Sequence, residues 1–111
     1  EVLTGGPFVP TPQQVVEQML QVAGVSQRDF VIDLGSGDGR IVLTAAQKYR
    51  ARGMGVDIDE RLVEFSNQRA RRLGVDSLAW FRQQDVMETR ISEATVLTLY
   101  LLPEMMRALH M

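Results

Sequence analysis

Residues 31–40 read VIDLGSGDGR and bring three glycines at alternate positions together with two acids. Glycine lets the backbone approach a ligand closely and adopt a positive φ without a clash at Cβ. A helix expected directly after this loop would present unpaired N–H groups and the positive end of its dipole. The segment therefore predicts a turn that binds a nucleotide or a cofactor after a buried strand. The alternative is a tight strand-to-helix turn without a ligand.

The glycine spacing separates two kinds of ligand. A dinucleotide-binding loop has the pattern G-x-G-x-x-G, with the pyrophosphate on the helix N-terminus. This loop has the pattern D-x-G-x-G-x-G, with Asp33 ahead of it and Asp38 inside it. Two carboxylates disfavour a pyrophosphate and suit a ligand with a cationic amino group or a sulfonium. A nicotinamide-dependent oxidoreductase is therefore the less favoured alternative.

Two further acids follow expected strands. Asp57 lies 22 residues after Gly35, close to the ~20-residue offset of a ribose-binding carboxylate, and an ionised carboxylate accepts hydrogen bonds from hydroxyl groups. Ile58 would lie against an adenine face, Asp85 would accept from the adenine amino group, and Val86 would contact the ring. The alternatives are a solvated acid for Asp57, a core residue for Ile58 and a surface turn for Asp85.

Apolar periodicity predicts the elements that position these residues. Helices are expected from Pro12 to Gly24, over about 39–50 and over about 60–73, and strands over 30–34, 54–58, 79–83 and 94–102. Thr11 is expected to cap the first helix in a capping box with Gln14. Residues 1–11 are expected to be loop, residues 86–93 a connection with room for one helical turn, and residues 104–111 the start of a helix. Alternating strands and helices predict a parallel sheet with right-handed crossovers.

Composition narrows the function classes. The chain has 111 residues, which suits one domain, and a net charge of −2, which gives no general attraction to nucleic acid or to an anionic membrane. It has no cysteine, so disulfides and thiolate metal sites are excluded, and no metal site is predicted. No apolar stretch approaches the ~20 residues of a membrane span, and there is no signal-peptide pattern. The cytoplasm is the expected location. The arginines of the third helix, Arg61, Arg69, Arg71 and Arg72, are expected on a solvated face.

The segments VIDLGSGDGR, GVDIDE and QQDVME stand in the order and spacing of three motifs of the class I, seven-β-strand S-adenosylmethionine (SAM) methyltransferases. The chain resembles this family over residues 11–102. The resemblance implies an α/β, Rossmann-like parallel sheet with flanking helices, incomplete at about four strands in the order 3-2-1-4, plus an N-terminal helix. It implies SAM as the cofactor.

The same resemblance assigns roles to the candidate residues. Asp33 and the loop at Gly35, Ser36 and Gly37 would hold the methionine moiety. Asp57 would bind the ribose hydroxyls, and Asp85 with Val86 would bind the adenine.

A narrower likeness concerns the methyl acceptor. The segments FVPTPQQVVEQML and ATVLTLYLLPEMM are similar to small protein-lysine methyltransferases, in which a threonine matching Thr11 approaches the cofactor and the segment matching residues 98–104 borders the acceptor channel. Tyr100 is the candidate catalytic residue, with a core position as the alternative. The chain lacks the paired asparagines of the histone enzymes at about residues 97–98, and it lacks the Asn/Asp-Pro-Pro-aromatic motif of other amino-methylating enzymes.

The resemblance predicts a SAM-dependent protein-lysine methyltransferase. A sulfonium donor is already activated, so the protein mainly aligns the acceptor and excludes water, and no dedicated base is required. The resembled fold has seven strands, and this chain supplies the cofactor half. Its fourth strand, over 94–102, would then be an exposed apolar edge, which predicts a homodimer or a partner chain paired at that strand. The alternative is that the 111 residues are a fragment of a longer product. The alternative function is a SAM-binding module or half-enzyme without its own catalysis.

Overall fold

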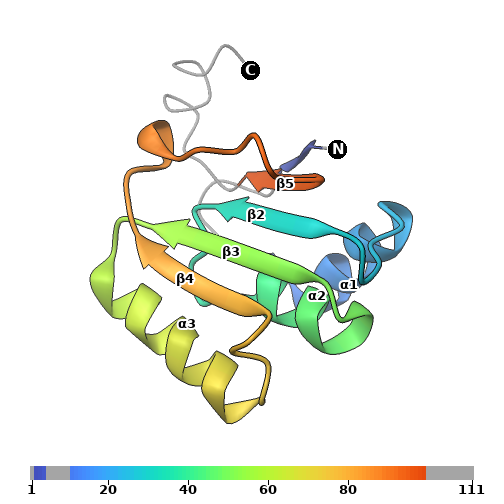
Figure 1. Cartoon of the computed structure of the whole chain (residues 1–111), viewed down its shortest axis with the longest axis horizontal. Helices are drawn as coiled ribbons and strands as arrows, with labels where there is room; N and C mark the ends of the chain where they lie inside the picture. The colour runs from blue at the N-terminus through green and yellow to red at the C-terminus, as the bar shows by residue number, and fades with distance from the viewer. Residues whose placement is uncertain (1, 5–10, 100–111) are drawn as a thin grey trace.

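A parallel sheet with helices on one face forms the molecule. The computed structural model describes residues 2–4 and 11–99, with side chains for residues 11–99 (Figure 1). Five strands are hydrogen-bonded in the order β1-β5-β2-β3-β4, and every neighbouring pair is parallel. Figure 1 shows the three α-helices on one side of the sheet, below and partly behind the strands in that view. The predicted order 3-2-1-4 is confirmed, because it corresponds to β4-β3-β2-β5 in this numbering.

Most predicted elements are present with small shifts of their ends. The strands are β1 (Val2–Thr4), β2 (Phe30–Leu34), β3 (Arg52–Asp57), β4 (Ala79–Gln83) and β5 (Val96–Leu99), and the helices are α1 (Gln13–Val22), α2 (Arg40–Tyr49), α3 (Glu60–Arg72) and the short 3-10 helix η1 (Val86–Glu88). Three strand limits differ from expectation: β3 begins two residues earlier and ends one residue earlier, at Asp57, and β5 begins at Val96 rather than at residue 94. The end expected for that strand, at residue 102, and the helix expected over 104–111 lie outside the described residues.

The N-terminal segment corrects one prediction. Residues 2–4, expected to be loop, form β1 and pair in parallel with β5 from Val2↔Leu97 to Thr4↔Leu99. Three residues are too few to show the alternation that marks a strand in a sequence, and β5 offers an unpaired edge that such a segment can join. The prediction that β5 is an exposed edge is therefore wrong over these three pairs.

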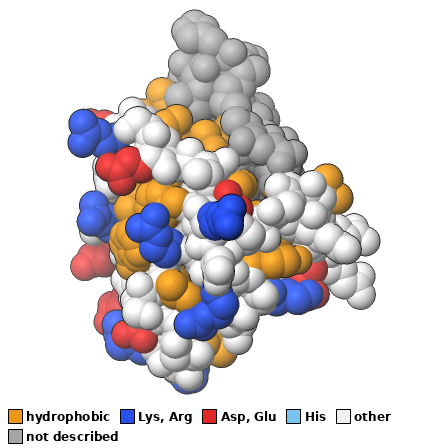
Figure 2. Space-filling model, turned by 45° about the vertical axis from the view of Figure 1, so that its right-hand side comes forward, with side chains coloured by type: hydrophobic (Ala, Val, Ile, Leu, Met, Phe, Trp, Pro, Cys, Tyr) orange, Lys and Arg blue, Asp and Glu red, His pale blue; other side chains and the backbone are white. Residues whose placement is uncertain are grey.

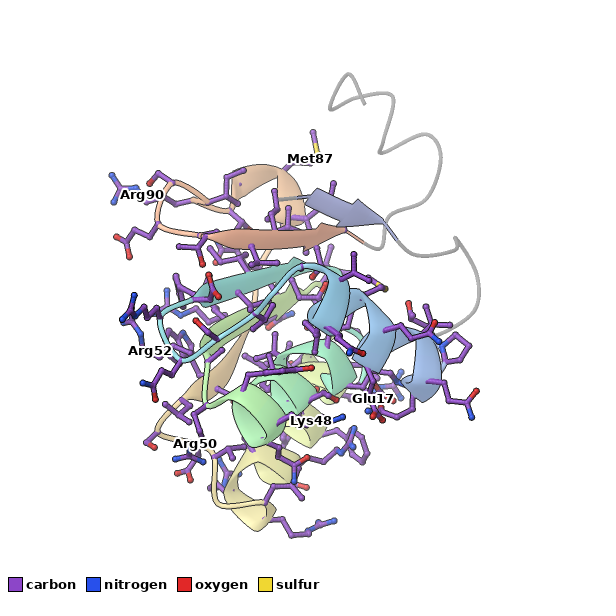
Figure 3. All side chains as sticks on the ribbon, turned by 90° about the vertical axis from the view of Figure 1, so that its right-hand side faces the viewer. Glu17, Lys48, Arg50, Arg52, Met87 and Arg90 are labelled. Carbon is purple, nitrogen blue, oxygen red and sulfur yellow. The ribbon has the colours of Figure 1, made fainter. Side chains whose placement is uncertain are left out.

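The start of α1 corrects a second prediction. Its N-cap is Pro12, and no side chain caps it. The helix thus begins one residue later than expected, so Gln14 takes the second helical position instead of the third and the capping box loses its register. The neighbouring Gln13 donates its Nε2–H to Thr44 Oγ1 of α2 at 2.9 Å. An ion pair between Glu17 and Lys48, at 2.8 Å, joins the same two helices (Figure 3).

The sheet has two unlike faces. The helix face carries Val31, Ala79, Phe81 and Val96, which are buried beneath α1, α2 and α3. The loop face carries the alternate residues of the same strands, and its buried cluster comprises Ile32, Leu34, Met54, Val56 and Leu99, with Phe30, Trp80, Val86 and Ala94 packed against it. No α-helix of residues 11–99 contributes to that second cluster, which is covered in part by the connection from β4 to β5.

The outer edge of the sheet at β4 is closed by a side chain. Asn67 of α3 donates its Nδ2–H to the carbonyl of Phe81 and accepts the N–H of Phe81 at its Oδ1, both at 3.0 Å. The amide thus satisfies the two backbone groups that an additional strand would otherwise pair with. This contact also fixes α3 against β4.

Candidate functional site

The glycine loop connects β2 to α2 at the carboxyl end of the sheet. Gly37 has φ +56°, and Gly39, the N-cap of α2, has φ +83°, so both lie in the left-handed region where glycine is favoured. A Cβ on Gly39 would lie 2.8 Å from Phe81 Cζ and 2.9 Å from Ser66 Oγ. A Cβ on Gly37 would meet no atom of the described chain within 4 Å. Gly39 is therefore needed for packing, whereas Gly37 borders open space.

The end of β3 fixes the loop from one side. The N–H groups of Gly35 and Ser36 both donate to the carbonyl of Val56 at 2.9 Å. The N–H of Gly37 donates to Asp57 Oδ2, also at 2.9 Å. These three donors are thus engaged within the protein. Gly35, Ser36 and Gly37 as cofactor contacts stay a prediction.

Helix α3 fixes the same loop from the other side. Ser66, which is fully buried, donates its hydroxyl to the carbonyl of Gly37 at 3.2 Å. Arg69 donates its Nη1–H to the next carbonyl, that of Asp38, at 2.9 Å. The loop conformation is therefore set by two elements that lie far apart in the sequence. The prediction that all four arginines of this helix are merely solvated is wrong for Arg69.

Asp57 is the half-buried acid at the end of β3. Its Oδ2 accepts the N–H of Gly37, and its Oδ1 accepts the N–H of Asp59 at 3.0 Å. Each carboxylate oxygen can accept a second hydrogen bond, so the group is fixed in orientation and keeps acceptor capacity for a ligand. Ile58, directly after it, is 74% exposed. The alternative of a core position for Ile58 is therefore excluded.

Asp85 lies at the end of β4 and is exposed. It is the N-cap of η1, and its Oδ1 accepts the N–H of Met87 at 2.8 Å. The turn that the sequence left open as an alternative is thus present, and one carboxylate oxygen is engaged in it. The side chain of Val86 packs against the loop-face cluster. Adenine contacts of Asp85 and Val86 stay a prediction.

Asp33 is a buried carboxyl on the helix face. It is 1% exposed, and its Oδ1 accepts the hydroxyl of Thr98 on β5 at 2.7 Å. Burial, reinforced by the nearby charges of Asp57 and Asp38, raises the pKa of Asp33 to about 7, and the Thr98 hydrogen bond opposes this rise. Asp33 therefore joins β2 to β5 and is only partly ionised near neutral pH. Its contact with a ligand stays a prediction.

Asp38 has a different environment from the one its position in the loop implied. Arg40 pairs with it in a fork, with Nη2–Oδ2 at 2.6 Å and Nε–Oδ1 at 3.1 Å. The Arg40 hydrogen bonds hold the pKa of Asp38 below its usual range, and Arg69 lies 4.0 Å from Oδ2. Because two guanidinium groups offset its charge, Asp38 does not supply a free anion. That part of the electrostatic argument for a cationic ligand is wrong.

Arg40 also reaches the start of α1. Its Nη1–H donates to the carbonyl of Thr11 at 2.9 Å, which ties the half-buried Thr11 to the glycine loop. Thr11 is thus brought next to the loop through its backbone. Tyr100 lies outside the described residues, as does most of the predicted acceptor segment 98–104. The sequence marked neither Arg40 nor Ser66 as a site residue, although Arg40 directly follows the glycine loop.

Known proteins resemble this chain in sequence and structure. A family model described as the ANTKMT methyltransferase domain matches residues 33–111. A protein-lysine N-methyltransferase of Saccharolobus islandicus is 43% identical over 97 residues, which are 86% of this chain and 60% of the relative. The adenine nucleotide translocase lysine N-methyltransferase of Mus musculus is 28% identical over 103 residues, or 93% of this chain and 44% of the relative. The chain thus spans about half the length of these curated relatives.

A solved structure is more similar still. The crystal structure of an RNA methyltransferase from Salinibacter ruber in complex with S-adenosyl-L-homocysteine superimposes with a TM-score of 0.88 at 52% identity. The match covers 92% of this chain and 67% of that chain. As a separate finding on this chain, no helix within residues 11–99 has the length and apolar character of a bilayer span.

Proposed function

Because this chain belongs to the ANTKMT methyltransferase domain family, we propose that it carries the cofactor-binding part of a SAM-dependent methyltransferase acting on protein lysine. The family membership confirms the resemblance found in the sequence. The observation that carries the proposal is the glycine loop clamped between β3 and α3, with Asp57 fixed beside open space at Gly37.

The residues of this edge fit the parts of SAM. The carboxylate of Asp57 has acceptor capacity for the two ribose hydroxyls, and the exposed Ile58 next to it offers an apolar surface to the adenine. Asp85 and Val86 follow the neighbouring strand β4, at the same edge of the sheet. Thr11, Asp33, Gly35, Ser36 and Gly37 complete the proposed site around the methionine end. When bound, SAM supplies a methyl group on a sulfonium that any correctly aligned neutral amine can attack.

The protein's own contribution is alignment and dehydration. A lysine amine must lose its proton before it can attack, and burial lowers the pKa of an amine. Holding donor and acceptor in line supplies much of the rate enhancement without an acid or a base from the protein. Tyr100 remains the candidate residue beside the acceptor.

RNA is the second candidate acceptor. The observation that favours it is the name of the Salinibacter ruber structure, which shares 52% identity with this chain. The net charge of −2 weighs against it, because phosphate contacts need clustered cations. Transfer from labelled SAM to a cell lysate separates the possibilities: label removed by protease supports lysine, label removed by ribonuclease supports RNA, and SAM binding without transfer supports a binding module.

Calorimetric titration tests the cofactor site directly. Asp57→Ala should weaken SAM binding by about 1–3 kcal/mol, because it removes charged acceptors from a partly buried site. The exposed acid Asp76 provides the matched control, and Asp76→Ala should leave the affinity unchanged. Equal affinities for wild type and Asp57→Ala would remove Asp57 from the site. Tight binding of NAD with no binding of SAM would overturn the proposed function.

Location and assembly belong to the same proposal. We place the protein in the cytoplasm and expect a second copy or a partner chain at the β5 edge of the sheet. Since β1 occupies three positions of that edge, a second chain has to pair beside β1 or replace it. A monomer in sedimentation at micromolar concentration would contradict this assembly.

A further inference from the structure

The connection from β4 to β5 differs from the two crossovers before it. The crossovers from β2 to β3 and from β3 to β4 carry α2 with 10 residues and α3 with 13 residues. The connection over residues 84–95 carries only η1, which has three residues. All-parallel sheets are normally covered by helices on both faces. Here a crossover without an α-helix passes over the loop face, and residues 11–99 leave part of that face uncovered.

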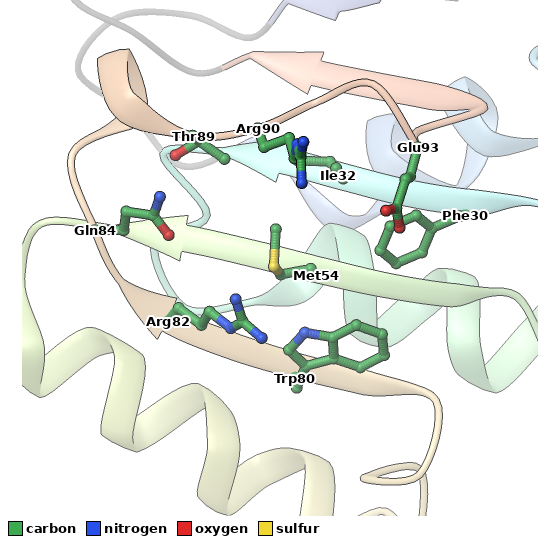
Figure 4. A pocket seen from close by; sticks show the side chains of 9 residues that line it. All are labelled: Phe30, Ile32, Met54, Trp80, Arg82, Gln84, Thr89, Arg90 and Glu93. Carbon is green, nitrogen blue, oxygen red and sulfur yellow. The ribbon is translucent and has the colours of Figure 1, made fainter.

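A pocket of about 310 Å³ lies where the helix is missing (Figure 4). Its floor is apolar and comes from three adjacent strands: Phe30 and Ile32 of β2, Met54 of β3 and Trp80 of β4. The rings of Phe30 and Trp80 stack with their centroids 5.7 Å apart. Its size is at the lower end of the range for ligand sites, so it has room for one bulky apolar group rather than for a large cofactor.

The rim of the pocket is polar and carries two arginines against one glutamate. It comprises Arg82, Gln84, Thr89, Arg90 and Glu93. Among the described residues, neither Arg82 nor Arg90 has a carboxylate within 4.0 Å, and Glu93 has no ion-pair partner. A third arginine, Arg52, lies with its guanidinium 5.4 Å from the centre of the Phe30 ring. Figure 3 shows Arg52 and Arg90 on the same side of the molecule, and Figure 2 shows basic side chains beside apolar surface.

We propose that this pocket binds an acidic segment of the acceptor polypeptide, with one bulky apolar side chain on the floor and carboxylates on the arginines. The inference rests on the proposed function, because it assumes a protein acceptor. Unpaired guanidinium groups bind carboxylates in a fork geometry, and three arginines face only one glutamate. The apolar floor, with Phe30 and Trp80, suits an apolar side chain rather than a phosphate backbone, which needs cationic contacts along its whole length.

The position of the pocket suits a docking site for a substrate. Gln84 on its rim directly precedes Asp85, so the pocket reaches the carboxyl end of β4 beside the proposed cofactor site. A polypeptide held there can continue from the loop face to the edge of the sheet where transfer would occur. The pocket therefore supplies binding energy away from the reacting lysine.

Trp80 makes the proposal measurable, because it is the single tryptophan of the chain. The full chain is titrated with a short peptide in which phenylalanine is flanked by aspartates and glutamates, and the fluorescence emission of Trp80 is followed. A saturable change is expected, and Arg82→Gln with Arg90→Gln should weaken the affinity roughly tenfold or more, since charge-assisted hydrogen bonds are lost. Arg72→Gln, at the end of α3, is the matched control and should leave the affinity unchanged.

Three outcomes overturn the proposal. The first is a Trp80 emission that the acidic peptide does not change. The second is a response to a lysine-flanked peptide or to a single-stranded oligonucleotide instead. The third is a failure of iodide to quench Trp80 in the free protein, which would mean that the pocket is already filled. Calorimetry with SAM on the same variants keeps the two hypotheses apart. If the wild type does not bind SAM, the proposed function is refuted. If it binds SAM but does not respond to the peptide, only the proposal that the pocket binds an acidic segment is refuted.

Discussion

The helix face and the loop face of the sheet are packed differently, because α-helices cover the first and a connection without an α-helix crosses the second. On the helix face, β3 has Gly53 and Gly55, and a Cβ on Gly53 would lie 2.8 Å from Val42 Cγ1 of α2. On the loop face, the same strand contributes Met54 and Val56. Where α2 packs on β3, the helix fills the space and a side chain larger than glycine would collide with it. On the loop face, Met54 and Val56 of the same strand fill the space, and a pocket remains beside them.

This difference separates the roles of the two faces. Besides the end of β3, the glycine loop is fixed from the helix side of the molecule by Ser66 and Arg69 of α3, with Phe81 packed beneath Gly39. The pocket is on the other face. Changes on the helix face should therefore affect both folding and the cofactor loop, whereas changes on the loop face should affect partner binding with a smaller effect on folding.

Two neighbouring residues of β4 give the largest contrast. Phe81, 4% exposed, points to the helix face, and Trp80, half-buried, points to the loop face. Phe81→Ala should lower the free energy of unfolding by about 3–5 kcal/mol, because it opens a cavity beneath the glycine loop. Trp80→Ala should cost roughly 1–2 kcal/mol, since its side chain is already partly in solvent. Urea denaturation followed by circular dichroism measures both.

A second pair of variants keeps the comparison possible if Phe81→Ala does not fold. If Phe81→Ala is too unstable to purify, Phe81→Leu is compared with Trp80→Leu, and the change at the buried Phe81 should cost more than the change at the half-buried Trp80. Equal losses for the substitutions at the two positions would show that the faces are packed alike, and the distinction between them would fail.

The pH dependence of stability should also depend on the helix face, through Asp33. Its pKa is about 7 in the folded protein against an ordinary value of 3.8. Between these values the unfolded chain ionises Asp33 and the folded chain does not, so the free energy of unfolding falls as the pH rises from about 4 to about 7. The full difference is roughly 4 kcal/mol, at 1.36 kcal/mol per pH unit.

Asp33→Asn tests this assignment, because the amide can still accept from Thr98 and does not titrate. The free energy of unfolding of the variant minus that of the wild type, measured by urea denaturation, should be more favourable to the variant at about pH 8 than at about pH 4.5. Asp76→Asn, at an exposed position, should leave the pH dependence of the free energy of unfolding unchanged. An unchanged pH profile in Asp33→Asn would mean that another group carries the dependence.

The sequence predicted the parts of the fold that depend on local pattern. Apolar runs and periodicity gave β2 and β4 with correct ends and all three α-helices to within a few residues. It failed for β1, where three residues carry no period and pairing depends on the distant β5. It also failed for the cap of α1, where a shift of one residue removes the register of the box.

The candidate site divides in the same way. The offset from Gly35 identified Asp57 as a residue of the strand edge, and the structure brings it to Gly37. The roles of Ser66 and Arg69 could not be predicted, because they depend on how α3 packs against a loop about 30 residues away in sequence. The pairing of Asp38 was also missed: its main partner is Arg40, two residues along the chain, and Arg69 adds a second guanidinium group 4.0 Å away only in the folded chain.

The smallest test compares two glycines of the same region. Gly55→Ala would place a Cβ 2.6 Å from Phe81 Cδ1 and 2.6 Å from Ser36 Cβ, so it should lower the free energy of unfolding by about 1–3 kcal/mol. Gly37→Ala meets no described atom within 4 Å, so only the strain of a positive φ, about 1 kcal/mol, should remain. Calorimetry should rank them in reverse for SAM, with Gly37→Ala weakening binding more, because its new methyl projects into the open space proposed for the cofactor. A larger loss of SAM affinity in Gly55→Ala than in Gly37→Ala, measured where both variants are fully folded, would contradict this ranking. It would mean that SAM binding depends on how the loop packs on the helix face rather than on the open space at Gly37.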